Sequence, residues 1–154
     1  MRQNEWTEQI AALPMRWDKS GNLRVLMVTS RDTGRWVVPK GWVVDSKKPW
    51  RTAEIEALEE AGAVGVVSKR PISHFFYDKQ YEDKSDVRCR VTVFPMVVEK
   101  LKRRWKEKDE RTRDWFSPDQ AAKLVAEQDL SHFLRDLSDN QEAQAVIKRL
   151  RKAA

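Results

Sequence analysis

The sequence has very few of the residues that build disulfides or zinc sites. It contains one cysteine, Cys89, and two histidines, His74 and His132. A single cysteine excludes an intramolecular disulfide, and the histidines have no neighbours in sequence that suggest zinc binding or nucleophilic catalysis. We therefore expect both histidines to be structural, and Cys89, which alternates with valines, to be a small buried hydrophobe.

Long apolar runs are also missing. No stretch approaches the about 20 apolar residues that a membrane helix needs. The first residues lack the basic-then-apolar pattern of a secretory signal. Together with 40% hydrophobic and 35% charged residues, these absences predict a soluble, cytoplasmic globular protein with no membrane partner.

The length of 154 residues fits one domain spanning 1–154. Lysine and arginine exceed the acidic residues by six, 30 against 24. This excess favours anionic partners such as nucleotides, polyphosphates or nucleic acid, without choosing among them.

Apolar β-rich runs between turn residues predict strands over 23–29, 36–38, 64–67, 72–77 and 87–98, with a short one at 115–116. Helices are expected over 50–61, which Gly62 can end as a left-handed cap, from a capping box at 117–120 to about 127, and through a tail over about 130–152. The charged stretch 100–113 is expected to be a solvated loop. An apolar stripe in the tail predicts core packing, with a dimer contact as the alternative: Ala143, Val146, Ile147 and Leu150.

The helix expected over 50–61 has two distinct faces. Glu56, Glu59 and Glu60 share an arc of about 100°, and the other face carries a tryptophan and three alanines. Like charges at this spacing repel each other. A hard divalent cation, Mg²⁺ or Mn²⁺, would offset the repulsion; the alternative is a solvated acidic face.

The segment 41–63, GWVVDSKKPWRTAEIEALEEAGA, resembles the Nudix box. Gly41 matches the first glycine, Gly62 matches the second, and Glu56, Glu59 and Glu60 match the glutamates, with the spacing intact. Lys47 and Ile55 stand where the family has a glutamate and an arginine that are thought to brace the loop against the helix. Because the glutamate and the arginine are both absent, neither leaves an unpaired charge behind. A weakened enzyme is the alternative that this departure leaves open.

Outside the box, VLMVTSRDTGRWVVPKGW, RPISHFFYDK, RVTVFPMVVEK and DWFSPDQAAKLV resemble the Nudix subgroup of diphosphoinositol polyphosphate and diadenosine polyphosphate hydrolases. The resemblance implies an α/β fold, the Nudix α/β/α sandwich with a mixed sheet between helices. It also implies that Glu56, Glu59, Glu60 and the carbonyl of Gly41 hold Mg²⁺ or Mn²⁺. A downstream loop supplies another carboxylate in some relatives, for which Glu107, Asp109 and Glu110 are the candidates and Glu110 is chosen.

Substrate phosphates need cations, and arginine grips phosphate through paired hydrogen bonds. Five basic residues on turns or on one strand face are candidates, each with a solvated surface cation as the alternative: Arg31, Arg35, Lys40, Arg88 and Arg90. Trp36 and Trp42 flank the same loop and are either core residues or stacking partners for a base.

The resulting hypothesis is a pyrophosphohydrolase in which Glu56 or another glutamate orients or deprotonates the attacking water. Its substrate is an anionic phosphorylated small molecule, a nucleoside or inositol polyphosphate, and the chain acts as a monomer or homodimer. The alternatives are a Nudix-fold binding or regulatory protein and an RNA 5′-end pyrophosphohydrolase. A nucleic-acid-binding domain is disfavoured because no recognisable nucleic-acid motif is present.

Overall fold

The computed structural model describes residues 6–81, 83 and 85–154. The elements follow one another as β1 (Thr7–Trp17), β2 (Leu23–Thr29), β3 (Trp36–Val37), β4 (Lys40–Trp42), α1 (Pro49–Ala61), β5 (Ala63–Val67), β6 (Ser73–Gln80), β7 (Asp86–Leu101), β8 (Arg113–Phe116), α2 (Pro118–Leu124), α3 (Gln128–Arg135), the 3₁₀ turn η1 (Leu137–Asp139) and α4 (Gln141–Ala153).

One mixed sheet is built around a central parallel pair, β1 and β7. The outer side of β1 pairs with β4 near its start and with β2 near its end. The outer side of β7 pairs first with β6 and then with β5. Strands β3 and β8 add to β2, and all pairs except the central one are antiparallel.

Each central strand carries a proline where its outer partner changes. Pro14 lies between the part of β1 that pairs with β4 and the part that pairs with β2. Pro95 lies between the part of β7 that pairs with β6 and the part that pairs with β5. Because proline cannot donate a ladder hydrogen bond, it fits where the ladder is interrupted.

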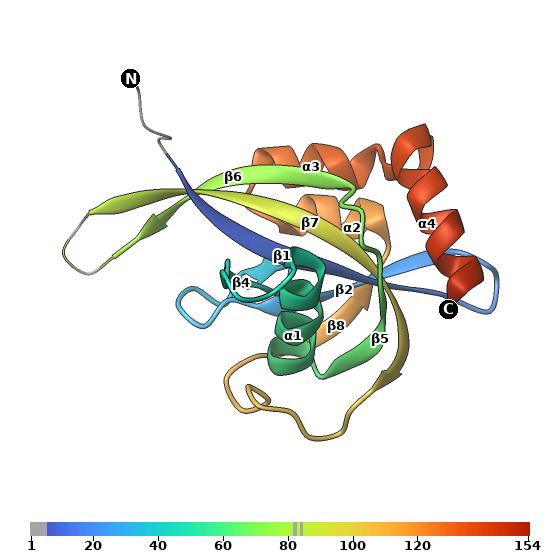
Figure 1. Cartoon of the computed structure of the whole chain (residues 1–154), viewed down its shortest axis with the longest axis horizontal. Coiled ribbons are helices and arrows are strands. Elements are labelled where there is room, and N and C mark those ends of the chain that lie inside the picture. Colours follow the sequence, from blue (N-terminus) through green and yellow to red (C-terminus); the bar gives the residue numbers. More distant parts are fainter. Residues whose placement is uncertain (1–5, 82, 84) are drawn as a thin grey trace.

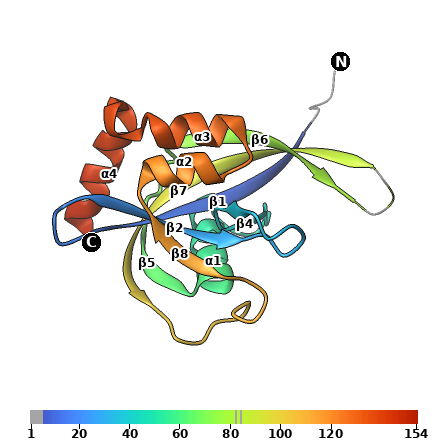
Figure 2. The ribbon, with the colours of Figure 1, turned by 180° about the vertical axis from the view of Figure 1, so that it is seen from behind.

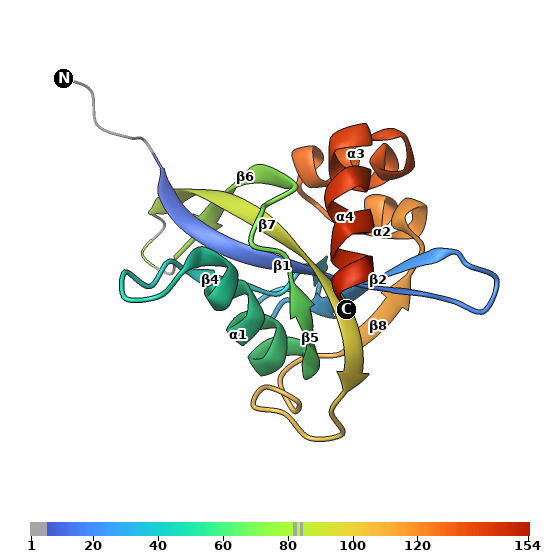
Figure 3. The ribbon, with the colours of Figure 1, turned by 45° about the vertical axis from the view of Figure 1, so that its right-hand side comes forward.

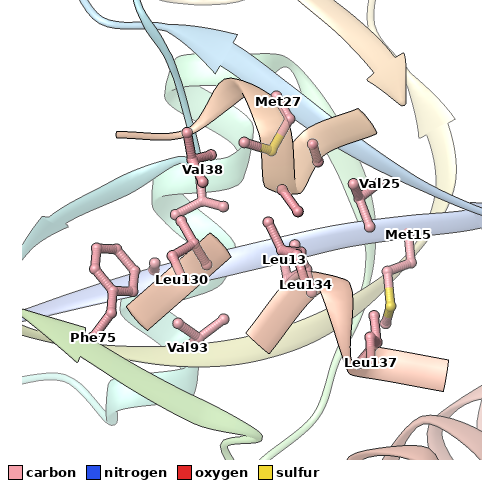
Figure 4. Close-up of a cluster of buried hydrophobic side chains, with 14 of the residues drawn as sticks. Leu13, Met15, Val25, Met27, Val38, Phe75, Val93, Leu130, Leu134 and Leu137 are labelled. Atoms are coloured by element: carbon pink, nitrogen blue, oxygen red, sulfur yellow. The ribbon is translucent and has the colours of Figure 1, made fainter. Parts of the chain in front are cut away.

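Helices cover both faces of the sheet. Helix α1 lies on one face, and α2, α3 and α4 lie on the other (Figures 1, 2 and 3). The larger core packs side chains such as Leu13, Met27 and Phe75 against Leu130 and Leu134 of α3 (Figure 4). A smaller core packs α1 against β1, β2 and β7. The expected α/β/α sandwich is therefore confirmed.

Most expected elements are present, with two differences. Strand β1 was not predicted by any local pattern. It forms the longest strand pairing that β7 makes, and it lies at the centre of the sheet. Strand β4 is the second element that was not expected, and the tail is helical as expected, in two helices separated by η1. The capping box at Ser117 is confirmed, and the stripe on α4 packs into the core through Ala143 and Ile147. Among the described residues, no helix is long and apolar enough to cross a membrane.

Candidate functional site

The helix that carries the acidic residues packs closely on the sheet through small side chains. Helix α1 has Pro49 in its first turn and ends at Gly62, whose φ of 65° is the left-handed cap predicted from sequence. Three alanines at the expected spacing are fully buried against the sheet: Ala53, Ala57 and Ala61. This packing fixes the acidic face of the helix relative to the sheet.

Glu60 is a buried carboxylate, with only 6% of its surface exposed. One of its oxygens accepts a hydrogen bond from the Lys40 backbone N–H at 3.3 Å, and the other lies 3.5 Å from the guanidinium of Arg111. The pKa of Glu60 is raised to about 8. Burial is the main cause, Arg111 opposes it, and the charge of Glu56 contributes to the increase. A further cation near this group would therefore stabilise its charged form.

Glu56 lies directly against the backbone of Gly41. A Cβ at position 41 would lie 2.5 and 2.8 Å from the two carboxylate oxygens of Glu56. Burial raises the pKa of Glu56, and the negative charges of Glu59 and Glu107 add to the effect. Among the ion pairs between described residues, none includes Glu56. The box glycine is thus required by the close approach of this carboxylate.

Glu59 is only half-buried. Its carboxylate pairs with Lys106 at 3.2 Å, and its backbone carbonyl accepts a hydrogen bond from the Glu107 N–H at 3.0 Å. The structure therefore places Glu56 against Gly41 and Glu60 beside the Lys40 backbone. Lys106 pairs with Glu59, and Arg111 pairs with Glu60.

Of the downstream acidic candidates, Glu107 is the one that lies beside the box. Its side chain is 13% exposed, and its charge helps to raise the pKa of both Glu56 and Glu60. Glu110, the choice made from sequence, has a side chain 48% exposed that pairs with Arg31 at 3.1 Å. Position alone favours Glu107 over Glu110 as a fourth carboxylate.

Arg111 is a site residue that sequence reasoning missed. Its side chain is only 9% exposed and lies 2.8 Å from Glu107 and 3.5 Å from Glu60. It also donates to the Thr29 carbonyl at 3.0 Å. Within a stretch as rich in charge as 100–113, no local pattern distinguishes one buried arginine from its solvated neighbours.

Three of the proposed phosphate-binding cations precede the box: Arg31 and Arg35 lie between β2 and β3, and Lys40 begins β4. The Lys40 ammonium lies 5.1 Å from the centre of the Tyr77 ring, and burial lowers its pKa against the opposing charges of Glu60 and Glu127. The exposed Arg35 donates to the Thr33 hydroxyl at 3.2 Å.

Arg88 and Arg90 lie on the face of β7 that also carries Phe94 and Met96, which pack against α1 in the smaller core. Both point to the opposite face of β7 from the buried Cys89, as the alternation predicted. Arg88 pairs with Asp78 at 3.1 Å and Arg90 with Glu8 at 3.5 Å. Their cations are already matched by acidic residues of the neighbouring strands.

The two tryptophans near the box differ in environment. Trp36 packs edge-on against Phe116, with ring centres 4.9 Å apart, and belongs to the core. Trp42, next to Gly41, is 42% exposed. Only Trp42 is therefore open to stacking on a substrate.

The donor set suits a hard divalent cation, because clustered carboxylates are the oxygen ligands that Mg²⁺ and Mn²⁺ prefer. In the part of the chain that the structure describes, no three acidic, histidine or cysteine side chains converge tightly enough to hold a metal ion. Two of the carboxylates are turned to cations of the protein instead, Glu59 to Lys106 and Glu60 to Arg111. The two carboxylates would have to exchange these protein cations for the metal to be held here.

Solved structures share this fold. The binary complex of a C. elegans Ap4A hydrolase has a TM-score of 0.64 at 17% identity, covering 86% of this chain and 96% of that one. The NUDIX domain of Shewanella oneidensis NrtR complexed with ADP ribose has a TM-score of 0.65 at 10% identity, covering 90% of each chain.

Curated relatives are more similar in sequence. "Nudix hydrolase 13, mitochondrial" of Arabidopsis thaliana is 29% identical to this chain over 131 residues, which cover 79% of this chain and 65% of the relative. "Nudix hydrolase 12, mitochondrial" of the same plant is 30% identical over 129 residues, which cover 79% of this chain and 64% of the relative. Human "Diphosphoinositol polyphosphate phosphohydrolase 3-alpha" is 30% identical over 103 residues, 66% of this chain and 58% of its own. The chain thus spans just under two thirds of the plant relatives. The model of the NUDIX domain matches residues 8–137, and the chain therefore belongs to the Nudix domain family.

Proposed function

We propose that this chain is a metal-dependent hydrolase of a diphosphate linkage in a nucleoside or inositol polyphosphate. The observation that carries the proposal is a pair of carboxylates on one turn of the box helix, the buried Glu60 and the partly buried Glu56, which lies against Gly41. Burying negative charge costs free energy unless a cation matches it, and carboxylates whose pKa is raised by burial are therefore candidates for a functional site. The names of relatives, which include Nudix hydrolases and diphosphoinositol polyphosphate phosphohydrolases, support the reaction class.

Each residue then has a defined task. Glu56, Glu59, Glu60 and the Gly41 carbonyl would hold Mg²⁺ or Mn²⁺, which would supply charge neutralisation at the phosphates and activation of water. Glu56 or Glu107 would orient the attacking water or accept its proton. Lys40 and Arg35 would bind substrate phosphates from the loop before the box.

A substrate panel tests this function. Purified protein would be assayed with Mg²⁺ and with Mn²⁺ on dinucleoside polyphosphates, diphosphoinositol phosphates, nucleoside triphosphates and 5′-triphosphate RNA. We expect metal-dependent release of phosphate or a nucleotide from one of the first two classes. Turnover of RNA ends alone would favour the RNA 5′-end alternative.

Binding without turnover would instead favour the regulatory alternative, which the Lys47 and Ile55 departures motivate. Equilibrium binding of each compound, measured beside the assay, separates a binding protein from an enzyme given the wrong substrate.

The proposed fourth carboxylate gives a direct prediction. Because Glu107 is largely buried beside the box and Glu110 is half-exposed, we expect Glu107→Gln to lower kcat/KM by about 10-fold to 100-fold. Glu110→Gln should change it less than about 3-fold, since an exposed ion pair contributes little. The reverse ranking in steady-state kinetics would restore Glu110 as the choice.

The cytoplasmic location and the monomer or homodimer state stay predictions. The two plant relatives are named as mitochondrial proteins, so location is best tested by imaging a tagged full-length protein in its own cells.

A further inference from the structure

The last turn of α1 is held by residues far away in the sequence. The final carbonyls of a helix have no partner within the helix and need donors from elsewhere. Here the Glu59 carbonyl accepts from the Glu107 N–H at 3.0 Å. The Glu60 carbonyl accepts from the Trp105 indole N–H at 3.1 Å, and the Ala61 carbonyl from the Arg113 guanidinium at 2.8 Å. Three donors from the segment 105–113 thus satisfy the turn that carries the acidic residues.

Trp105 and Arg113 also contact each other. The Arg113 guanidinium lies 3.8 Å from the centre of the Trp105 ring, a distance at which the cation is attracted to the ring face. Arg113 donates a second hydrogen bond to the Lys102 carbonyl at 2.9 Å. We call Trp105, Glu107 and Arg113 the helix clamp. The β7–β8 loop that leads through it passes beside the end of α1 (Figure 1).

Gly62 is needed for the helix clamp to come this close. A Cβ at position 62 would lie 2.8 Å from an Arg113 nitrogen and 2.9 Å from the Trp105 ring. The second glycine of the box therefore serves two purposes, the left-handed end of the helix and room for the two clamp side chains.

Arg111 links the helix clamp to the carboxylates. It holds the side chain of Glu107, whose N–H belongs to the clamp, and it contacts Glu60 on α1. Arg111 also donates a hydrogen bond to the Thr29 carbonyl, which connects Glu107 and Glu60 to the end of β2. The position of the acidic cluster thus depends on contacts at the C-terminal end of the helix.

The other end of α1 has no corresponding ion pair to another element among the described residues, although the Lys69 ammonium lies 5.3 Å from the centre of the Trp50 ring there. Lys47 is exposed and Ile55 has no charge to pair with it. Among the described residues, the ion pairs that join α1 to other elements involve only Glu59 and Glu60, with Lys106 and Arg111 of the β7–β8 loop. The Arg51 pair with Glu54 lies within the helix itself.

We propose that the helix clamp positions Glu59 and Glu60 for the metal in place of the missing pair at 47 and 55. Trp105 and Arg113 are then positioning residues, and the inference rests on the proposed function. The clamp acts through the backbone: it fixes the turn from which both carboxylates project.

Arg113→Lys and Trp105→Phe test the proposal. Lysine keeps the charge but loses the paired donors, and phenylalanine keeps a ring but loses the indole N–H. The matched control is Arg151→Lys, because Arg151 of α4 stacks on Trp17 at 4.0 Å, and α4 lies on the opposite face of the sheet from α1 (Figure 3). The readouts are Mn²⁺ binding by titration calorimetry and hydrogen exchange at two amides, that of Glu107 and that of Lys102, which donates to the Gly62 carbonyl at 2.8 Å.

Both clamp variants are expected to bind Mn²⁺ about 10-fold more weakly, the usual effect of losing a group that orients metal ligands, and to exchange these amides faster. The control should do neither. If Arg113→Lys does not fold, Trp105→Phe decides. Clamp variants that bind Mn²⁺ as tightly as the control would overturn the inference alone, whereas a wild-type chain that binds no Mn²⁺ would overturn the proposed function with it.

Discussion

Replacing Glu60 with glutamine is expected to abolish metal-dependent hydrolysis, as is the same change at Glu59. Glutamine keeps the size of the side chain but removes the negative charge that would hold a divalent cation. We expect kcat/KM to fall by about 10³-fold, within the range caused by losing a general base or a charge-stabilising group.

A matched control is available on the same helix. Glu54 is partly exposed and pairs only with Arg51 among the described residues, so Glu54→Gln should keep the wild-type rate. Steady-state kinetics on the substrate found by the panel compares the three variants. Wild-type rates in both Glu59→Gln and Glu60→Gln would show that the metal site is assigned wrongly.

Glu60→Gln should also make the metal-free protein more stable at alkaline pH. The folded protein raises the pKa of Glu60 from 4.5 to about 8, so between these values the folded state binds more protons than the unfolded state. The free energy of unfolding therefore falls as pH rises through this window. Glutamine does not titrate, and the variant should gain a few kcal/mol, roughly 4 at most, over wild type at pH 8 and almost nothing at pH 4.

Urea denaturation in EDTA at the two pH values measures this difference. A variant that loses stability with pH in parallel with wild type would mean that another group causes the dependence. An inactive but more stable variant is the outcome expected of a charge that is buried for function rather than for folding.

The box was readable from sequence because its signals are local. The arc of Glu56, Glu59 and Glu60, the buried alanine face and the left-handed Gly62 all follow from spacing along one helix. The capping box at Ser117 is equally local. Each of these features is determined by residues within a few positions of one another.

Strand β1 could not be read in this way. Its sequence, TEQIAALPMRW, is rich in residues that favour helix and contains Pro14. Its extended form is stabilised by pairing with β7, a partner far along the chain, and tertiary pairing overrides local propensity. The central strand of the sheet was for this reason the one that local patterns missed.

The acidic site was only partly predictable for a related reason. The helix clamp donates hydrogen bonds to backbone carbonyls of α1. Every residue has a backbone carbonyl, so no residue pattern shows which carbonyls will accept these bonds. Likewise, Glu107 and Glu110 differ only in burial, not in sequence context. The strand alternation correctly separated Arg88 and Arg90 from Cys89, but it does not say which face of β7 lies toward the box.

Gly41→Ala is expected to remove most of the activity while leaving the fold intact. A methyl group at this position would overlap the Glu56 carboxylate, so either the carboxylate or the β4 backbone must move. Displacing a reacting group by about 1 Å costs about 10²-fold in rate, and we expect a loss of that order in kcat. Since no positive φ is required at Gly41, the change should cost little stability.

Gly21→Ala is the control, because it places the same methyl group in the opposite situation. Gly21 has a φ of 82° but open space around it, so alanine there should lower stability by about 1 kcal/mol through backbone strain and leave kcat unchanged. Thermal unfolding and kinetics on both variants separate the two effects. If Gly41→Ala keeps full activity, Glu56 does not need its place against the box glycine, and its role as a metal ligand beside the Gly41 carbonyl would have to be abandoned.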